Sequence, residues 1–197
     1  MGACHVIKIG GSLFDIAGEI ILDIISSGSP VVVVPGGGPF IELTEKCGIG
    51  EDESHWMAIA GMEQYGWYLS SFGMPATDCF ELSRDQVILL PYRIMRDNDP
   101  LPHSWNVSSD TIAAWIAWRL GKKLILLKSV DGISIGGHIQ SRITAPVISR
   151  EVDPHLIPFI LGNKVPAYLL NGRKRERLIS FLRGSCEVPG TLIGTTF

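Results

Sequence analysis

Two short apolar segments run directly into consecutive glycines, and this pattern restricts the possible folds more than any other in the chain. Residues 6–9 lead into Gly-Gly-Ser at 10–12, and four valines at 31–34 lead into Pro-Gly-Gly-Gly-Pro at 35–39. A strand that ends in glycines before a helix leaves backbone N–H groups free, where the helix dipole also favours an anion. The sequence therefore predicts two anion pockets, and Lys8 adds a positive charge to the first.

Strand and helix patterns alternate along all 197 residues. The predicted strands are 5–9, 31–34, 87–90, 124–127, 167–170 and about 191–193, with a small hairpin or lobe in 128–150. The predicted helices are 16–24, 39–46, about 54–72, 110–120, about 155–162 and about 173–183. Strands that are apolar on both faces and alternate with helices indicate an α/β protein with a mainly parallel sheet covered on both sides. We expect one domain spanning 1–197, with ligands at the carboxyl ends of its strands.

Local signals set the expected ends of several elements. Ser54 is the expected cap of the long helix, and Ser109 or Asp110 the expected cap of the helix that ends at Gly121. The polar segment 93–106 contains two prolines, so we expect a loop there.

Composition excludes several classes of partner. The formal net charge is −3, and we find no basic block or aromatic signature of a nucleic-acid-binding protein. No apolar run approaches the ~20 residues that span a bilayer, and the first residues resemble a strand rather than an export signal, so we expect a cytoplasmic protein without membrane contact. The four scattered cysteines are expected to be buried thiols. The basic stretch 173–177 is either a solvated helix start or a phosphate contact.

The individual motifs are weak signals. Lys8 precedes its glycines, so the first turn is neither a Walker P-loop nor a dinucleotide-binding GxGxxG turn. Ser-Ser-Asp-Thr at 108–111 is an ordinary helix cap when taken alone, and Asp-Gly at 131–132 an ordinary turn. Lys128, however, lies with Asp131 at the end of a third predicted strand, where a ligand would bind.

Taken together, these segments resemble the amino acid kinase family. The matching segments are 8–12, 35–38, 109–113, 126–133, 171–173 and 190–193, in the family's order and across nearly the whole chain. The resemblance implies an open three-layer αβα sandwich that transfers the γ-phosphoryl group of ATP to a carboxylate, carbamate or phosphate. Such a transfer needs positioning and charge neutralisation more than proton abstraction, which agrees with the lack of a Ser/His/Asp triad.

The resemblance also implies roles for individual residues. Lys8 would hold the transferring phosphoryl group, and Asp110 would orient the lysines. ATP would be bound by Gly10, Gly11, Ser12, Ser129, Val130, Asp131, Gly132, Ile133, Asn171, Gly172 and Arg173. The acceptor would meet Gly36, Gly37, Gly38 and Ser109. Mg²⁺ would be held by the ATP phosphates without a dedicated protein site.

One departure from the family pattern concerns the second catalytic lysine. Several members carry it after the Gly-Gly of the hairpin, but 136–142 contains none here. Lys128 is the candidate replacement, and Arg142 is a weaker one. A homo-oligomer is the expectation that the family supplies.

Segments on the acceptor side look like one subgroup, the [5-(aminomethyl)furan-3-yl]methyl phosphate kinases of methanofuran biosynthesis. They are Ser54-His55, His103-Ser104-Trp105 before Ser109-Asp110, and Asn171-Gly172-Arg173 with Glu176-Arg177. The resemblance implies that a phosphate monoester becomes a diphosphate. His55 and His103 would bind the acceptor phosphate beside Ser104, Trp105 would stack on the furan ring, and Glu63 or Asp99 would meet the aminomethyl cation.

Two alternatives remain open at this point. The acceptor could be isopentenyl phosphate, a nucleoside monophosphate or an acylamino acid, and an isopentenyl acceptor would need an apolar tunnel without a carboxylate. A family member that binds nucleotide without turnover is the other alternative.

Overall fold

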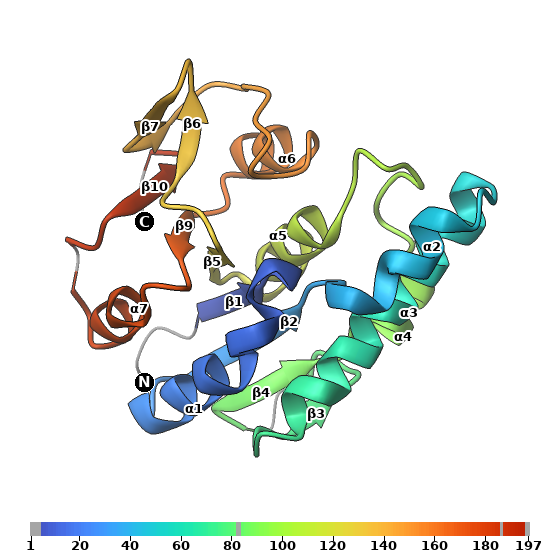
Figure 1. Ribbon diagram of the computed structural model, residues 1–197, viewed down its shortest axis with the longest axis horizontal. Helices are drawn as coiled ribbons and strands as arrows, with labels where there is room; N and C mark the ends of the chain where they lie inside the picture. The colour runs from blue at the N-terminus through green and yellow to red at the C-terminus, as the bar shows by residue number, and fades with distance from the viewer. Residues whose placement is uncertain (1–4, 82–83, 186, 196–197) are drawn as a thin grey trace.

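The computed structural model describes residues 5–81, 84–185 and 187–195, and its centre is an eight-stranded sheet (Figure 1). The strand order is β3-β4-β2-β1-β5-β9-β10-β8, and every pairing is parallel except that between β9 and β10. The strands are β1 (His5–Ile9), β2 (Val31–Pro35), β3 (Ala76–Thr77), β4 (Gln86–Leu89), β5 (Lys123–Lys128), β8 (Arg142–Ile143), β9 (Ala167–Asn171) and β10 (Gly190–Ile193). Strands β6 (Ile133–Ile135) and β7 (His138–Gln140) form the separate hairpin predicted in 128–150.

The helices join these strands and cover both faces of the sheet, which confirms the predicted three-layer α/β sandwich (Figure 1). They are η1 (Gly11–Ile16), α1 (Ala17–Ser27), η2 (Gly38–Ile41), α2 (Glu42–Lys46), α3 (Glu51–Ser70), α4 (Pro91–Asn98), α5 (Ser109–Leu120), α6 (Leu156–Asn163) and α7 (Arg175–Leu182). Two apolar cores follow from this arrangement. One lies between the sheet and α4, α5 and α6, and the other between the sheet and α1, α7 and the second half of α3.

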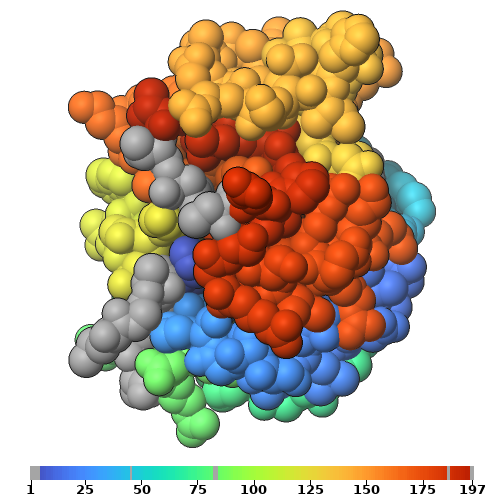
Figure 2. Space-filling view, turned by 90° about the vertical axis from the view of Figure 1, so that its left-hand side faces the viewer, coloured from blue at the N-terminus to red at the C-terminus, as the bar shows by residue number. Residues whose placement is uncertain are grey.

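The strand sequences explain why both cores are well filled. All five residues of β2 are buried, as expected of β-branched side chains that alternate between two covered faces. On β1, Val6 points into the first core and Ile7 and Ile9 into the second. Figure 2 shows α7 packed against α1 on this face of the molecule.

Four local expectations were wrong. The segment 93–106 is not all loop, because α4 continues to Asn98 and ends at Asp99 in a left-handed conformation (φ 41°). Helix α3 begins at Glu51 rather than after Ser54. Ser108 caps α5 in place of Ser109 or Asp110, because its hydroxyl accepts a hydrogen bond from the N–H of Asp110. The short strands β3 and β8 were not expected.

The cysteine expectation was also wrong where it can be compared. Cys47 is exposed and Cys79 is half-buried, whereas Cys4 and Cys186 lie outside the described residues. Within the described ranges, no helix is both long and apolar enough to cross a membrane.

Candidate active site

The two glycine turns lie against each other at the carboxyl ends of β1 and β2. A Cβ atom on Gly11 would stand 2.7 Å from the Cα of Gly38, so only glycine fits this contact. Gly38 itself has a φ of 56°, a conformation that glycine adopts without strain. The N–H of Gly36 donates to the carbonyl of Ile9 at 2.9 Å, which extends the β1–β2 ladder into the turns. The predicted donor and acceptor pockets therefore share a wall.

Asp110 joins two lysines beside these turns. Lys8 Nζ lies 2.7 Å from Asp110 Oδ1, and Lys128 Nζ donates to Asp110 Oδ2 at 2.5 Å. Lys8 reaches the site from β1, Lys128 from the end of β5 and Asp110 from the first turn of α5. Lys8 and Asp110 are almost completely buried, while Lys128 is partly exposed. The structure thus brings together the three residues predicted to be catalytic.

The charges in this group depend on one another. Burial raises the pKa of Asp110, but the ammonium groups of Lys8 and Lys128 more than offset this and hold its pKa below the usual value. Burial and the neighbouring charge of Lys128 lower the pKa of Lys8, although Asp110 opposes the change. The carboxylate of Asp110 thus lies between two lysine side chains, an arrangement whose positive charge can attract an anion.

Asp153, which the sequence did not single out, holds the start of α5 in place. Its Oδ2 accepts from the Ser108 N–H at 3.1 Å, the Ser108 hydroxyl at 2.8 Å and the Thr111 N–H at 3.0 Å. Its Oδ1 accepts from the Thr111 hydroxyl at 2.6 Å and from the N–H groups of His155 and Leu156 at 3.1 and 2.9 Å. One buried carboxylate therefore joins the start of α6 to the turn that carries Asp110. Its only sequence signal is an aspartate before a predicted helix.

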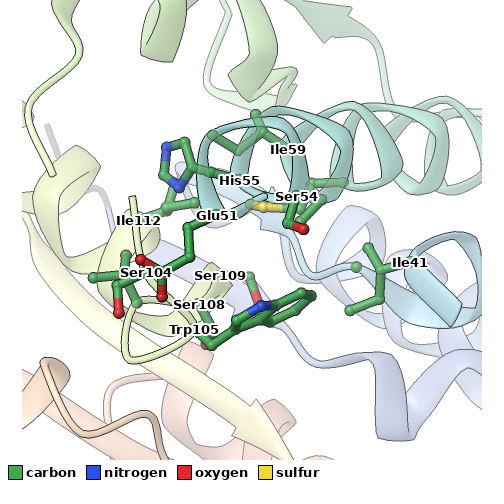
Figure 3. A pocket seen from close by; sticks show the side chains of 14 residues that line it. Ile41, Glu51, Ser54, His55, Ile59, Ser104, Trp105, Ser108, Ser109 and Ile112 are labelled. Atoms are coloured by element: carbon green, nitrogen blue, oxygen red, sulfur yellow. The ribbon is translucent and has the colours of Figure 1, made fainter. Parts of the chain in front are cut away.

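A cavity of about 260 Å³ opens at the second glycine turn and the start of α5, the helix that carries Asp110. It is lined by Gly37, Ile41, Glu51, Ser54, His55, Ala58, Ile59, Met62, Ser104, Trp105, Val107, Ser108, Ser109 and Ile112 (Figure 3). Gly37 brings the second glycine turn to its wall, and Ser108 and Ser109 bring the start of α5. Five residues predicted to meet the acceptor therefore line one cavity, namely Gly37, His55, Ser104, Trp105 and Ser109.

His55 is the buried polar group of this cavity. Burial, and then the nearby charge of His103, lower the pKa of His55 to about 4, so the ring is neutral at pH 7. Its Nε2 is buried and has no hydrogen-bond partner within the described part of the chain. His103 stacks on this ring with centroids 4.2 Å apart but is not among the lining residues. The His103 ring donates hydrogen bonds to the carboxylates of Asp99 and Asp52, and these bonds raise the pKa of His103.

Comparison with known proteins agrees with this geometry. The sequence pattern of the amino acid kinase family matches residues 3–145. The chain belongs to the amino acid kinase family. It is 31% identical to the [5-(aminomethyl)furan-3-yl]methyl phosphate kinase of Methanocaldococcus jannaschii, over 96% of this chain and 98% of that one. An acetylglutamate kinase of Bacillus thuringiensis subsp. konkukian is 25% identical over 97% and 95% of the two chains.

Solved kinases share the fold at lower identity. Uridylate kinase from Archaeoglobus fulgidus superposes with a TM-score of 0.70 at 21% identity, covering 96% of this chain and all of that one. An isopentenyl phosphate kinase superposes with a TM-score of 0.63 at 16% identity, covering 96% of this chain and all of the other. These likenesses confirm the amino acid kinase fold, and the protein is a phosphotransferase of this family.

The predicted ATP-binding segments of this kinase meet at the ends of β1, β5 and β9. Arg173 pairs with Asp15 and donates to the carbonyl of Ser12 at 2.8 Å, which ties the 171–173 turn to the first glycine turn. The N–H of Gly10 donates to the carbonyl of Leu127 at 3.0 Å, which joins the first glycine turn to the end of β5. The turn that contains Ser129 and Val130 comes directly after β5.

Asp131 forms the next part of this surface. It pairs with Lys174 at 3.0 Å and with Arg177 at 2.7 Å, and it accepts from the amide of Asn171 at 3.1 Å. Its hydrogen bonds from Lys174 and Asn171 lower the pKa of its carboxyl group. Arg175 instead pairs with Glu19 and Asp23 on α1. The basic stretch is thus neutralised by acidic partners in this structure.

Other residues of the predicted ATP site hold the turn after β5 in place through hydrogen bonds and close packing. Ile133 is fully buried and its N–H donates to Thr191 Oγ1 at 2.8 Å. A Cβ on Gly132 would stand 2.5 Å from the same oxygen, so this position is closely packed. Gly172 donates to the carbonyl of Lys128 at 2.8 Å, which fixes the two turns to each other.

The alternative cation Arg142 lies elsewhere. It is exposed on β8, at the edge of the sheet, and its guanidinium donates to the carbonyl of Thr195 at 3.4 Å. Lys128, in contrast, contacts Asp110 directly. The geometry therefore favours Lys128 as the second cation.

The carboxylates suggested for an acceptor cation are already engaged. Glu63 accepts from the N–H of Tyr92 at 2.9 Å and so caps α4. Asp99 accepts from His103 Nε2 at 2.8 Å. Neither lines the cavity, and the carboxylate that does is Glu51.

One group among the described residues could bring three metal ligands together, namely His55, Asp99 and His103. The two imidazole rings are stacked with an angle of only 20° between their planes. The in-plane lone pairs of such rings run side by side instead of converging on one ion. In this arrangement His103 packs against the ring of His55, and the three side chains do not coordinate a cation.

Proposed function

We propose that the protein is an ATP-dependent kinase of a small phosphate monoester, [5-(aminomethyl)furan-3-yl]methyl phosphate, which it converts to the diphosphate in methanofuran biosynthesis. The Lys8–Asp110–Lys128 group is linked through the start of α5 to a cavity with a buried, neutral histidine, and this arrangement is the observation that supports phosphoryl transfer. The likeness to the [5-(aminomethyl)furan-3-yl]methyl phosphate kinase of Methanocaldococcus jannaschii, 31% identical over 96% of this chain, supports the choice of acceptor.

The donor would bind across the first glycine turn. The N–H groups at the start of η1 lack partners within that helix, and they face the same strand ends as Lys8. Asp131, Asn171 and Arg173 would border the rest of the nucleotide. Mg²⁺, held by the ATP phosphates, would add positive charge that stabilises the transferring group.

The acceptor phosphate would lie between Gly37, His55 and the start of α5. Because His55 is neutral, its ring can donate one hydrogen bond to a phosphate oxygen without fixing a second positive charge there. A phosphate oxygen of the acceptor then attacks the γ-phosphorus, and the bond to the β-bridging oxygen breaks as ADP leaves. The attacking oxygen already carries negative charge, so no general base is required, and Lys8 and Lys128 stabilise charge on the transferring group.

An acceptor panel tests this proposal. The protein is incubated with Mg-ATP and the aminomethylfuran phosphate, isopentenyl phosphate, uridine monophosphate or acetylglutamate, while ADP release and product mass are measured. We expect turnover with the furan phosphate and a product heavier by one phosphoryl group. Turnover of a different acceptor alone would overturn the proposed substrate, and ATP binding without turnover on any acceptor would overturn the proposed activity.

A further inference from the structure

The acceptor cavity holds one charged side chain that the phosphoryl transfer does not use. Glu51 is the first residue of α3, and its side chain reaches toward Ser104 and Trp105 (Figure 3). The other lining residues are apolar, small or hydroxylic, apart from His55. Because His55 is neutral at pH 7, the carboxylate of Glu51 is the one full charge among the described lining residues.

Glu51 has no cation partner of its own. Its neighbour Asp52 pairs with His103 at 2.8 Å, whereas Glu51 forms no ion pair within the described ranges. An acidic residue in a first helical turn usually stabilises the helix dipole, but Asp52 and Glu53 already provide this in α3. Glu51 is also exposed, so its hydrated carboxylate is available to a ligand that enters the cavity.

His55 supplies a second polar group to the lining of this cavity. The side chain of His55 is only 8% exposed, and its Nε2 has no hydrogen-bond partner in the described structure. An unpaired buried nitrogen costs free energy unless a ligand satisfies it. The lining therefore combines a buried, neutral imidazole with an exposed carboxylate that has no ion-pair partner in the described ranges, and a ligand that carries an anionic and a cationic group can meet both.

We propose that Glu51 is a binding site for a positively charged ammonium group on the acceptor, so that this kinase selects phosphate monoesters that also carry an amine. The proposal rests on the proposed function in taking this cavity as the acceptor site. Trp105, about half exposed, offers an aromatic face that also attracts a cation. An acceptor tail with a carboxylate would be repelled by Glu51, and an apolar tail would desolvate that carboxylate without compensation.

The test compares acceptors that differ only in this charge. The wild-type kinase, Glu51→Gln and Glu53→Gln are assayed with the aminomethylfuran phosphate and with an analogue whose amine is replaced by a methyl group. Glu53→Gln is the matched control, because it removes a similar charge from the same helical turn outside the cavity lining. We expect Glu51→Gln to raise KM for the amine acceptor about tenfold, the effect of losing one charge-assisted hydrogen bond.

The methyl analogue should show a KM that Glu51→Gln leaves unchanged or lowers, and the KM for ATP should not move. Glu53→Gln should behave as the wild type with both acceptors. If Glu51→Gln retains the wild-type preference for the amine acceptor, the Glu51 site is wrong while the proposed function stands.

A binding measurement can test the ammonium site at Glu51 even if the furan phosphate is not phosphorylated. Calorimetry compares an ω-aminoalkyl phosphate with an alkyl phosphate of equal length, using the wild type and both variants. Tighter binding of the aminoalkyl phosphate that Glu51→Gln abolishes would support the ammonium site even without furan turnover. Equal binding of the two phosphates by the wild type would overturn it.

Discussion

Asp153 allows a prediction whose size follows from its contacts. In Asp153→Asn, one carboxylate oxygen becomes an NH₂ group that cannot accept hydrogen bonds. If the NH₂ group takes the place of Oδ2, the backbone N–H groups of Ser108 and Thr111 lose their acceptor. If it takes the place of Oδ1, the backbone N–H groups of His155 and Leu156 lose theirs. A hydroxyl group also faces the amide in either orientation. No flip of the side chain therefore avoids the loss.

Each unsatisfied buried donor costs about 1–3 kcal/mol, so two backbone N–H groups predict a loss of about 4 kcal/mol in the free energy of unfolding. For a chain of this length, that loss lowers Tm by about 10 °C. Urea unfolding and calorimetry measure both quantities. Asp97→Asn is the control, because Asp97 is exposed and meets Arg93 only at 3.8 Å, where an ion pair contributes less than about 1 kcal/mol.

Asp153→Asn also has an expected effect on activity that a purely structural role would not produce. The carboxylate of Asp153 helps to raise the pKa of Lys8, against the larger lowering by burial. Its neutralisation should therefore move the alkaline limb of the pH–activity profile to lower pH, and kcat should fall as the turn carrying Asp110 shifts. A loss of stability below about 1 kcal/mol together with an unchanged alkaline limb would refute the reasoning.

Four further predictions concern the site. Lys8→Ala should lower kcat about 10²- to 10³-fold with little change in the KM for ATP, because its charge acts on the transferring group, and a near-normal kcat would contradict this role. Lys128→Ala should also lower kcat, whereas Arg142→Ala should not, and the reverse result would reassign the second cation. The kcat/KM of the wild type should decline at a pH below the usual lysine range of about 10.5, because burial and Lys128 lower the pKa of Lys8, and a decline only above that value would be inconsistent. Because the pKa of His55 is about 4, acceptor binding, once corrected for ionisation of the acceptor itself, should show no transition near pH 6.5. Titration of His55 by nuclear magnetic resonance measures this pKa directly, and a midpoint near pH 6.5 would contradict the prediction.

The sequence was sufficient for the parts of the fold that depend on local patterns. Strands β1, β2, β4, β5, β9 and β10 lie within two residues of their predicted bounds, because each is a short apolar run bounded by turn residues. The start of α3 was misplaced because Ser54 resembles a cap, whereas the chain already turns into the helix after Gly50. Helix α4 was missed because it is a short helix that begins at Pro91 and receives its cap from Glu63, a residue distant in sequence.

Local sequence patterns likewise identified part of the site, whereas other parts depend on contacts between segments that are distant in the sequence. Lys8, Asp110 and Lys128 could be named from motifs, since the two lysines lie near the ends of predicted strands and Asp110 lies in the first turn of a predicted helix. Asp153 could not, because four of its six hydrogen bonds reach Ser108 and Thr111, more than 40 residues away, and form only when the starts of α5 and α6 come together. The carboxylate facing the acceptor was likewise sought at Glu63 or Asp99, and only the folded chain shows that both are occupied elsewhere.

This division has a physical basis in the reaction. Phosphoryl transfer requires the donor phosphates, two cations and the acceptor oxygen to be placed together, and in the proposed mechanism the glycine turns with Lys8 and Asp110 would do this for any anionic acceptor. The proposed acceptor site instead assigns the choice of acceptor to side chains that do not touch the transferring group, such as Glu51 and Trp105. These residues can change without affecting the phosphate geometry, so short motifs predict the chemistry of this kinase better than its substrate. The comparison of Glu51→Gln with Lys8→Ala makes this separation measurable, because the first should change KM for the acceptor and the second kcat.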